Sequence, residues 1–109
     1  MLQVTFLRDG RGQFRAFSAR GHADFAEHGE DIVCAAVSAI LQAARLGLER
    51  HAGIAPAAVQ SPGEMELGWS AADAELESVR AIVATAEMAI DEIARRYPEH
   101  VRLTISPQG

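Results

Sequence analysis

The segment from residue 74 to residue 97 places the strongest constraint on the fold, because its apolar residues recur at the period of an α-helix. They follow one another at spacings of three or four: Leu76, Val79, Val83, Ala86, Ile90, Ile93 and Tyr97. Residues at these spacings form one stripe along a helix, and such a stripe has to pack against a core. Pro98 cannot continue a helix. We therefore predict a core-facing helix that ends near Tyr97.

Residues 30–51 show a second helical pattern. The apolar positions again lie three or four residues apart: Val33, Val37, Ile40, Ala44 and Leu48. Asp31 stands where a helix N-cap is expected, and Gly53 lies just beyond the end of the pattern. The segment therefore predicts a helix that begins next to Asp31.

The rest of the chain favours strands. Residues 2–8 alternate, the sequence DGRG at 9–12 supplies a turn, and residues 13–20 can complete a hairpin. A second hairpin is predicted from a weak strand at 57–60, the turn SPG, and an alternating segment with Met65, Leu67 and Trp69 on one side. Residues 101–105 alternate again as a closing strand. The order β-β-α-β-β-α-β predicts a compact single-domain α+β sandwich with two helices packed on one mainly antiparallel sheet.

Composition narrows the function classes. The chain has 109 residues, which is a common size for one domain, and its formal net charge is -5. The arginines are scattered, whereas a nucleic-acid-binding domain shows a clustered basic surface, so we expect no direct nucleic-acid binding. The sequence shows no secretory leader and no apolar run of about 18 residues, which predicts a cytoplasmic protein without a membrane span.

The chain has a single cysteine, Cys34, three residues after Asp31. A cysteine attacks as its thiolate, and the start of a helix favours that negative charge. The unpaired N–H groups there can also hold an oxyanion. His22 lies in the preceding polar segment, which is bounded by Gly21 and Gly29 as candidate loop hinges.

Two other roles for Cys34 stay open on the residues alone. Free cysteines are among the most buried residues, so Cys34 can simply pack in the core. It can also join zinc ligands from the same stretch, although their spacing matches no standard site: His22, Asp24, His28, Asp31 and Cys34. Neither a metal nor a cofactor is expected.

The same stretch resembles the ribosomal-processing cysteine protease family, Prp. The resemblance rests on Gly21-His22-Ala23 and on the block GEDIVCAAVS at residues 29–38, with twelve residues from histidine to cysteine. It implies one Prp-like cysteine protease domain over residues 1–109, with His22 and Cys34 as the catalytic pair. Asp31 and Ser38 also match the motif as supporting residues. Asp31 either orients His22 or caps the helix, and the cap alone would account for it.

The resemblance further implies an endopeptidase that removes an N-terminal extension from the large-subunit ribosomal protein L twenty-seven. Its partners would be that ribosomal protein precursor, bound as a peptide substrate, and a second copy of the chain in a homodimer. One alternative is a non-catalytic, ribosome-associated peptide-binding module of the same fold. A thiol-based redox sensor is a weaker alternative, because the chain has no resolving cysteine.

Overall fold

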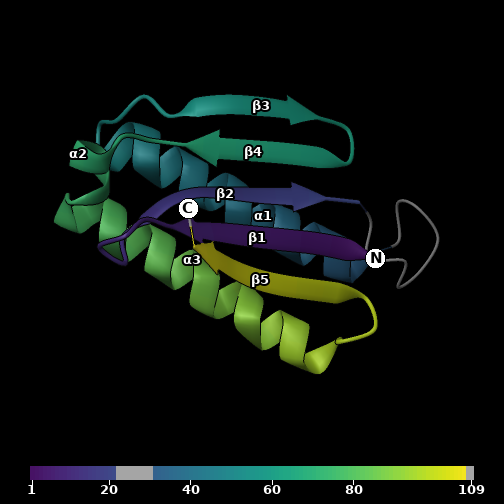
Figure 1. The fold of residues 1–109 in the computed structure, drawn as a ribbon. Helices are drawn as coiled ribbons and strands as arrows, with labels where there is room; N and C mark the ends of the chain where they lie inside the picture. The colour runs from purple at the N-terminus through teal and green to yellow at the C-terminus, as the bar shows by residue number, and fades with distance from the viewer. Residues whose placement is uncertain (22–30, 108–109) are drawn as a thin grey trace.

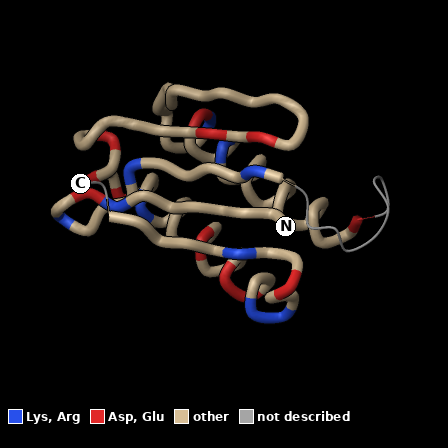
Figure 2. The backbone as a smooth tube through the Cα atoms, turned by 45° about the vertical axis from the view of Figure 1, so that its right-hand side comes forward, with Lys and Arg blue, Asp and Glu red and all other residues tan. Residues whose placement is uncertain are grey.

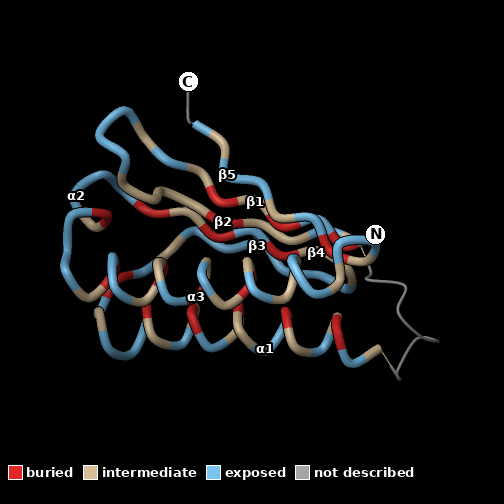
Figure 3. The backbone as a smooth tube through the Cα atoms, turned by 90° about the horizontal axis from the view of Figure 1, so that it is seen from below, coloured by how far each residue is buried: buried red, intermediate tan, exposed pale blue. Residues whose placement is uncertain are grey.

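Helices cover one face of a five-stranded sheet in the computed structural model, which describes residues 1–21 and 31–107 (Figure 1). The elements in chain order are β1 (Leu2–Arg8), β2 (Phe14–Arg20), α1 (Ile32–Leu46), the π-helix η1 (Gly47–His51), β3 (Ala57–Ser61), β4 (Glu64–Gly68), α2 (Ala71–Ala74), α3 (Glu77–Arg96) and β5 (Val101–Pro107). The predicted α+β sandwich is confirmed. Figure 3 shows the two long helices in one layer below the sheet.

The strands lie in the order β3-β4-β2-β1-β5. Neighbouring strands pair antiparallel except β1 and β5, which are parallel. The parallel pair runs the full length of both strands, from Leu2 opposite Val101 to Arg8 opposite Pro107. The sheet is therefore mixed, with its first and last strands side by side and β3 and β5 at its two edges.

Aromatic and aliphatic side chains on the helix-facing side of the sheet form the core. Phe6 pairs with Phe17 across β1 and β2, and Phe17 pairs with Leu67 across β2 and β4. All three are buried, and the Phe6 and Phe17 ring centroids lie 5.6 Å apart. Trp69 packs edge-on against Phe17, and its Nε1 donates to the Phe14 carbonyl at 2.9 Å. Burial of each such side chain stabilises the fold by roughly 1.5–3 kcal/mol.

Helix α1 packs a slightly different stripe than the sequence predicts. Val33, Val37 and Ala44 are buried as expected, but Leu41 is the buried residue of the middle turn. Ile40 is half-buried and lies in an apolar groove shared with α3 residues such as Ile82. The predicted pattern includes Ile40 and omits Leu41, whereas Leu41 is the more buried of the two in the structure.

The second long helix begins later than predicted. The chain forms the short helix α2, capped by Ser70, whose Oγ accepts from the Asp73 N–H at 3.1 Å. Leu76 then takes an extended backbone conformation, with φ -64 and ψ 132, and is 42% exposed. The predicted helix from residue 74 is therefore wrong at its start, because the chain breaks at Leu76 before α3. The stripe from Val79 to Ile90 is buried as predicted.

Helix α1 and its continuation, Ile32–His51, are long and apolar enough by length and composition to cross a membrane. From the sequence we predict no apolar run of about 18 residues, and that prediction does not hold for this helical segment. One such helix is weak evidence for a membrane span, since helices that pack in a protein core pass the same test. In this fold its buried residues belong to the hydrophobic core, and the helix lies in the layer beneath the sheet (Figure 3).

Candidate active site

Asp31 fixes the position of Cys34 at the start of α1. Its Oδ1 accepts a hydrogen bond from the Cys34 N–H at 2.9 Å, and its carbonyl accepts from the Ala35 N–H at 3.1 Å. The Asp31 backbone is extended, as an N-cap residue requires. The predicted cap is confirmed, and it holds Cys34 in the first turn of the helix.

The cap changes which donors can stabilise an oxyanion. The first N–H groups of a helix have no partner within the helix. The Cys34 N–H is nevertheless paired, because it donates to Asp31. The N–H groups of Ile32 and Val33 precede it, and neither has an acceptor among the described residues. Within residues 1–21 and 31–107, the N–H groups of the first helical turn that lack an acceptor are therefore those of Ile32 and Val33.

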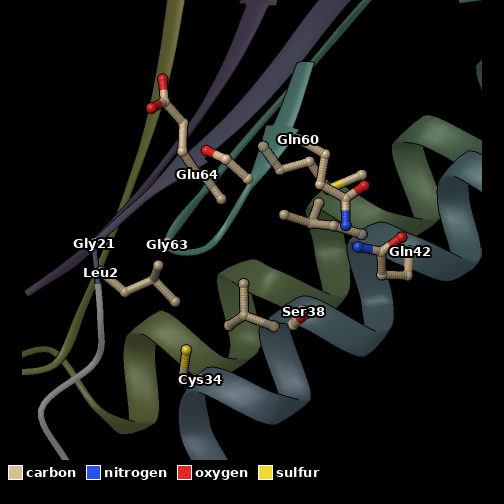
Figure 4. Close-up of a pocket in the computed structure, with 13 residues that line it drawn as sticks. Leu2, Gly21, Cys34, Ser38, Gln42, Gln60, Gly63 and Glu64 are labelled. Atoms are coloured by element: carbon tan, nitrogen blue, oxygen red, sulfur yellow. The ribbon is translucent and has the colours of Figure 1, made fainter. Parts of the chain in front are cut away.

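Cys34 lies in the wall of a pocket of about 130 Å³ between α1 and the β3–β4 hairpin (Figure 4). The side chain is half-buried and also touches the core. The pocket combines apolar and polar side chains and includes Leu2, Ala19, Gly21, Cys34, Val37, Ser38, Leu41, Gln42, Gln60, Ser61, Gly63, Glu64 and Met65. Cys34 therefore both packs and reaches a surface pocket, so the packing interpretation and the reactive one are compatible.

Ser38 and Gln42 continue the line that Cys34 begins along α1. The three residues lie four positions apart and all line the pocket. Such spacing places side chains one above the other on a helix face. The predicted position of Ser38 on the side of Cys34 is confirmed. Gln42 was missed, although the same spacing could have identified it.

Gln60 faces this line from the edge of the sheet (Figure 4). Its Oε1 accepts a hydrogen bond from Arg45 Nη1 at 3.0 Å, and Arg45 Nε in turn lies 3.5 Å from Glu49 Oε2. The bond commits the amide oxygen of Gln60 to α1 and leaves its amide N–H groups as donors. No local sequence pattern signals Gln60, because the packing of β3 over α1 brings it to the pocket.

Gly21 closes the pocket beside the β3–β4 turn. Its φ is +94, and a Cβ atom there would lie 2.7 Å from the Met1 carbonyl oxygen. Its N–H donates to the Gly63 carbonyl at 2.9 Å. Positive φ and this close approach account for the glycine. Its role as a hinge stays a prediction, and its predicted counterpart, Gly29, lies outside the described residues.

The predicted catalytic partner of Cys34, His22, also lies outside the described residues, as do Asp24 and His28. The separation of His22 and Cys34 and the zinc alternative therefore stay predictions. Within residues 1–21 and 31–107, no three His, Cys, Asp or Glu side chains group closely enough to hold a metal ion.

The sequence is similar to known cysteine proteases. The family model described as cysteine protease Prp matches residues 1–102. The ribosomal processing cysteine protease Prp of Bacillus subtilis (strain 168) is 29% identical over an aligned length of 110, and the match covers 95% of this chain and 96% of the relative.

Two solved structures share the fold. Prp from S. aureus, in complex with a covalently linked product peptide, is 25% identical and superposes with a TM-score of 0.86 over 96% of this chain and 99% of that one. SMU.848 from Streptococcus mutans is 29% identical, with a TM-score of 0.81 over 99% and 96% of the two chains. The family model and the shared fold each span nearly the whole sequence, and together they show that this chain belongs to the cysteine protease Prp family.

Proposed function

We propose that this protein is a cysteine endopeptidase in which Cys34 is the nucleophile and His22 is the general base and acid. The observation that carries the proposal is the position of Cys34, which stands in the capped first turn of α1 and lines a pocket. The cap fixes Cys34 in the first turn of α1, and the pocket wall makes its side chain accessible to a peptide. Membership of a cysteine protease family supports the same assignment.

The reaction follows from these two groups. The Cys34 thiolate attacks the scissile carbonyl carbon, a C–S bond forms, and the carbonyl electron pair moves to oxygen. The N–H groups of Ile32 and Val33, which precede Cys34 in the first turn and have no acceptor among the described residues, are the donors we assign to that oxyanion. When the tetrahedral intermediate collapses, the amine leaves with the proton of the His22 imidazolium. His22 then takes a proton from water, the resulting hydroxide attacks the thioester, and the C–S bond breaks to release the acid and the thiolate.

The substrate we propose is the precursor of ribosomal protein L twenty-seven, from which the enzyme removes an N-terminal extension. The name of the Bacillus subtilis relative, a ribosomal processing protease, supports a ribosomal protein as substrate. A complex with a covalently linked product peptide is known for the S. aureus protein, which supports a peptide as the substrate of this chain. We further propose that the enzyme works in the cytoplasm as a homodimer and without a cofactor.

The test is intact-mass spectrometry of the host precursor after incubation with the wild-type protein or with Cys34→Ala. We expect one new product pair with the wild type and none with Cys34→Ala or His22→Ala. Met88→Ala, on the exposed side of α3 and 58% exposed, is the matched control and should cleave normally.

Cleavage by Cys34→Ala at the wild-type rate would overturn the nucleophile assignment. If neither the wild type nor Cys34→Ala cleaves the precursor while both bind it, the protein is the non-catalytic peptide-binding module instead.

A further inference from the structure

Strand β3 is an uncharged edge of the sheet. It pairs with β4 on one side, and none of the described residues pairs with its other side. Its five residues, AAVQS, are all exposed and carry no charge (Figure 2). Sheet edges in natural proteins are usually protected by charged residues, prolines or bulges, because an open edge pairs readily with another strand. Here the prolines at 56 and 62 flank β3 and leave its interior unprotected.

The hairpin register identifies the free backbone groups on β3. Ser61 and Glu64 close a turn of two residues, and Val59 pairs with Glu66 farther along. In an antiparallel ladder, pairs that exchange hydrogen bonds alternate with pairs that do not. Counted from the closing pair, Ser61, Val59 and Ala57 bond to β4. The N–H and carbonyl groups of Ala58 and Gln60 therefore point to the open edge.

The open edge of β3 continues into the Cys34 pocket. Gln60 and Ser61, the last two residues of β3, both line that pocket. Gln60 thus has a side chain held over α1 by Arg45 and backbone groups at the sheet edge. Val59, the residue before Gln60, is 58% exposed and lies on the opposite face of the strand. A peptide that pairs along this edge therefore reaches the pocket that contains Cys34.

The opposite edge of the sheet lacks this continuity. Strand β5 carries Arg102 within it and ends at Pro107, two features that protect an edge. None of the described residues that line the Cys34 pocket belongs to β5. The two edges are therefore not equivalent for a peptide that must reach Cys34.

We propose that an extended peptide substrate adds to the sheet as a sixth strand on β3. Its backbone pairs with Ala58 and Gln60, and the peptide passes Ser61 into the Cys34 pocket. Backbone pairing of this kind supplies affinity with little demand on sequence, while pockets for alternate side chains supply specificity. This inference rests on the proposed function, because it assigns the substrate-binding strand of the same site.

The first test measures backbone amide exchange by NMR in the full-length Cys34→Ala protein, which cannot turn the peptide over. The probe is a synthetic peptide that covers the extension and the first mature residues of the host L twenty-seven precursor. We expect the exchange of the Ala58 and Gln60 amides to slow at least ten-fold on binding. The Val59 and Ser61 amides, already bonded to β4, and the amides of β5 should change far less.

The second test is kinetic and uses Ala58→Pro, which removes one edge N–H that the β4 ladder does not use. We expect KM for the peptide to rise about five-fold, the size of one lost hydrogen bond. Ala58→Ser keeps the N–H and is the matched control, with an unchanged KM. The rate at which a small alkylating reagent modifies Cys34 should be equal in all three proteins, which shows that the nucleophile is intact.

The outcomes separate the two proposals. If the wild type cleaves the peptide but binding leaves the Ala58 and Gln60 amides unprotected, the β3 inference is wrong and the proposed function stands. If the peptide binds with those amides protected but is never cleaved, the inference stands and the protease assignment fails. A peptide that does not bind Cys34→Ala at all overturns the β3 inference.

Discussion

At the scale of a single residue, Asp31 determines both where α1 begins and which donors lie free beside Cys34. Its carboxylate accepts from the Cys34 N–H, so Cys34 carries the thiol and also donates the hydrogen bond of the cap. In the proposed mechanism the same carboxylate has a second candidate role, which is to orient His22. A neutral cap residue separates these two roles, because it keeps the acceptor and removes the charge.

Asp31→Ala should lower the free energy of unfolding by about 1 kcal/mol, the usual cost of a lost N-cap. Asp31→Ser keeps an oxygen acceptor and should recover most of that stability. Since we assign Asp31 to the cap, we expect the serine variant to cleave within about two-fold of the wild-type rate. Urea denaturation and precursor cleavage measure the two effects separately. A serine variant that is stable but cleaves slowly would instead assign the carboxylate to His22.

At the scale of an element, α1 shows which of two neighbouring residues carries the packing. Leu41 is 1% exposed and lies against the sheet, whereas Ile40 is half-buried beside α3. Leu41→Ala should therefore cost about 2–5 kcal/mol of folding stability, as buried leucines do. Ile40→Ala removes a side chain of the same volume and should cost clearly less. Urea denaturation compares them directly, and equal losses would contradict the observed burial.

The elements also show where sequence patterns predict structure and where they do not. Both hairpins, the Asp31 cap and the stripe from Val79 to Ile90 were predictable, because each depends on neighbours within a few residues. The break at Leu76 was not, since its apolar side chain fits the helical period and the competing turn chemistry begins at Ser70. The parallel pairing of β1 with β5 joins the two ends of the chain, and no local pattern encodes it.

At the scale of the whole molecule, the site forms where the layers meet. Helices lie on one face of the sheet, and within residues 1–21 and 31–107 none lies on the other (Figure 3). The pocket therefore combines a motif that is local in sequence, around Cys34, with side chains such as Gln60 that arrive through tertiary packing. The part of the pocket around Cys34 was predictable from the spacing of residues on α1. The part that comes from the β3–β4 hairpin depends on the order of the strands, which the sequence pattern leaves undetermined.

The net charge of -5 should act on substrate capture and not on the chemical step. A basic ribosomal precursor is attracted to an acidic protein at long range, and salt screens that attraction as the Debye length falls from about 10 Å at 0.1 M to about 3 Å at 1 M. We expect kcat/KM for the full precursor to fall several-fold between 0.05 and 0.5 M NaCl, with kcat nearly constant. A short uncharged peptide that spans the same cleavage site is the control and should show little change. If kcat falls with salt for both substrates, salt affects the enzyme itself and electrostatic steering is not the cause.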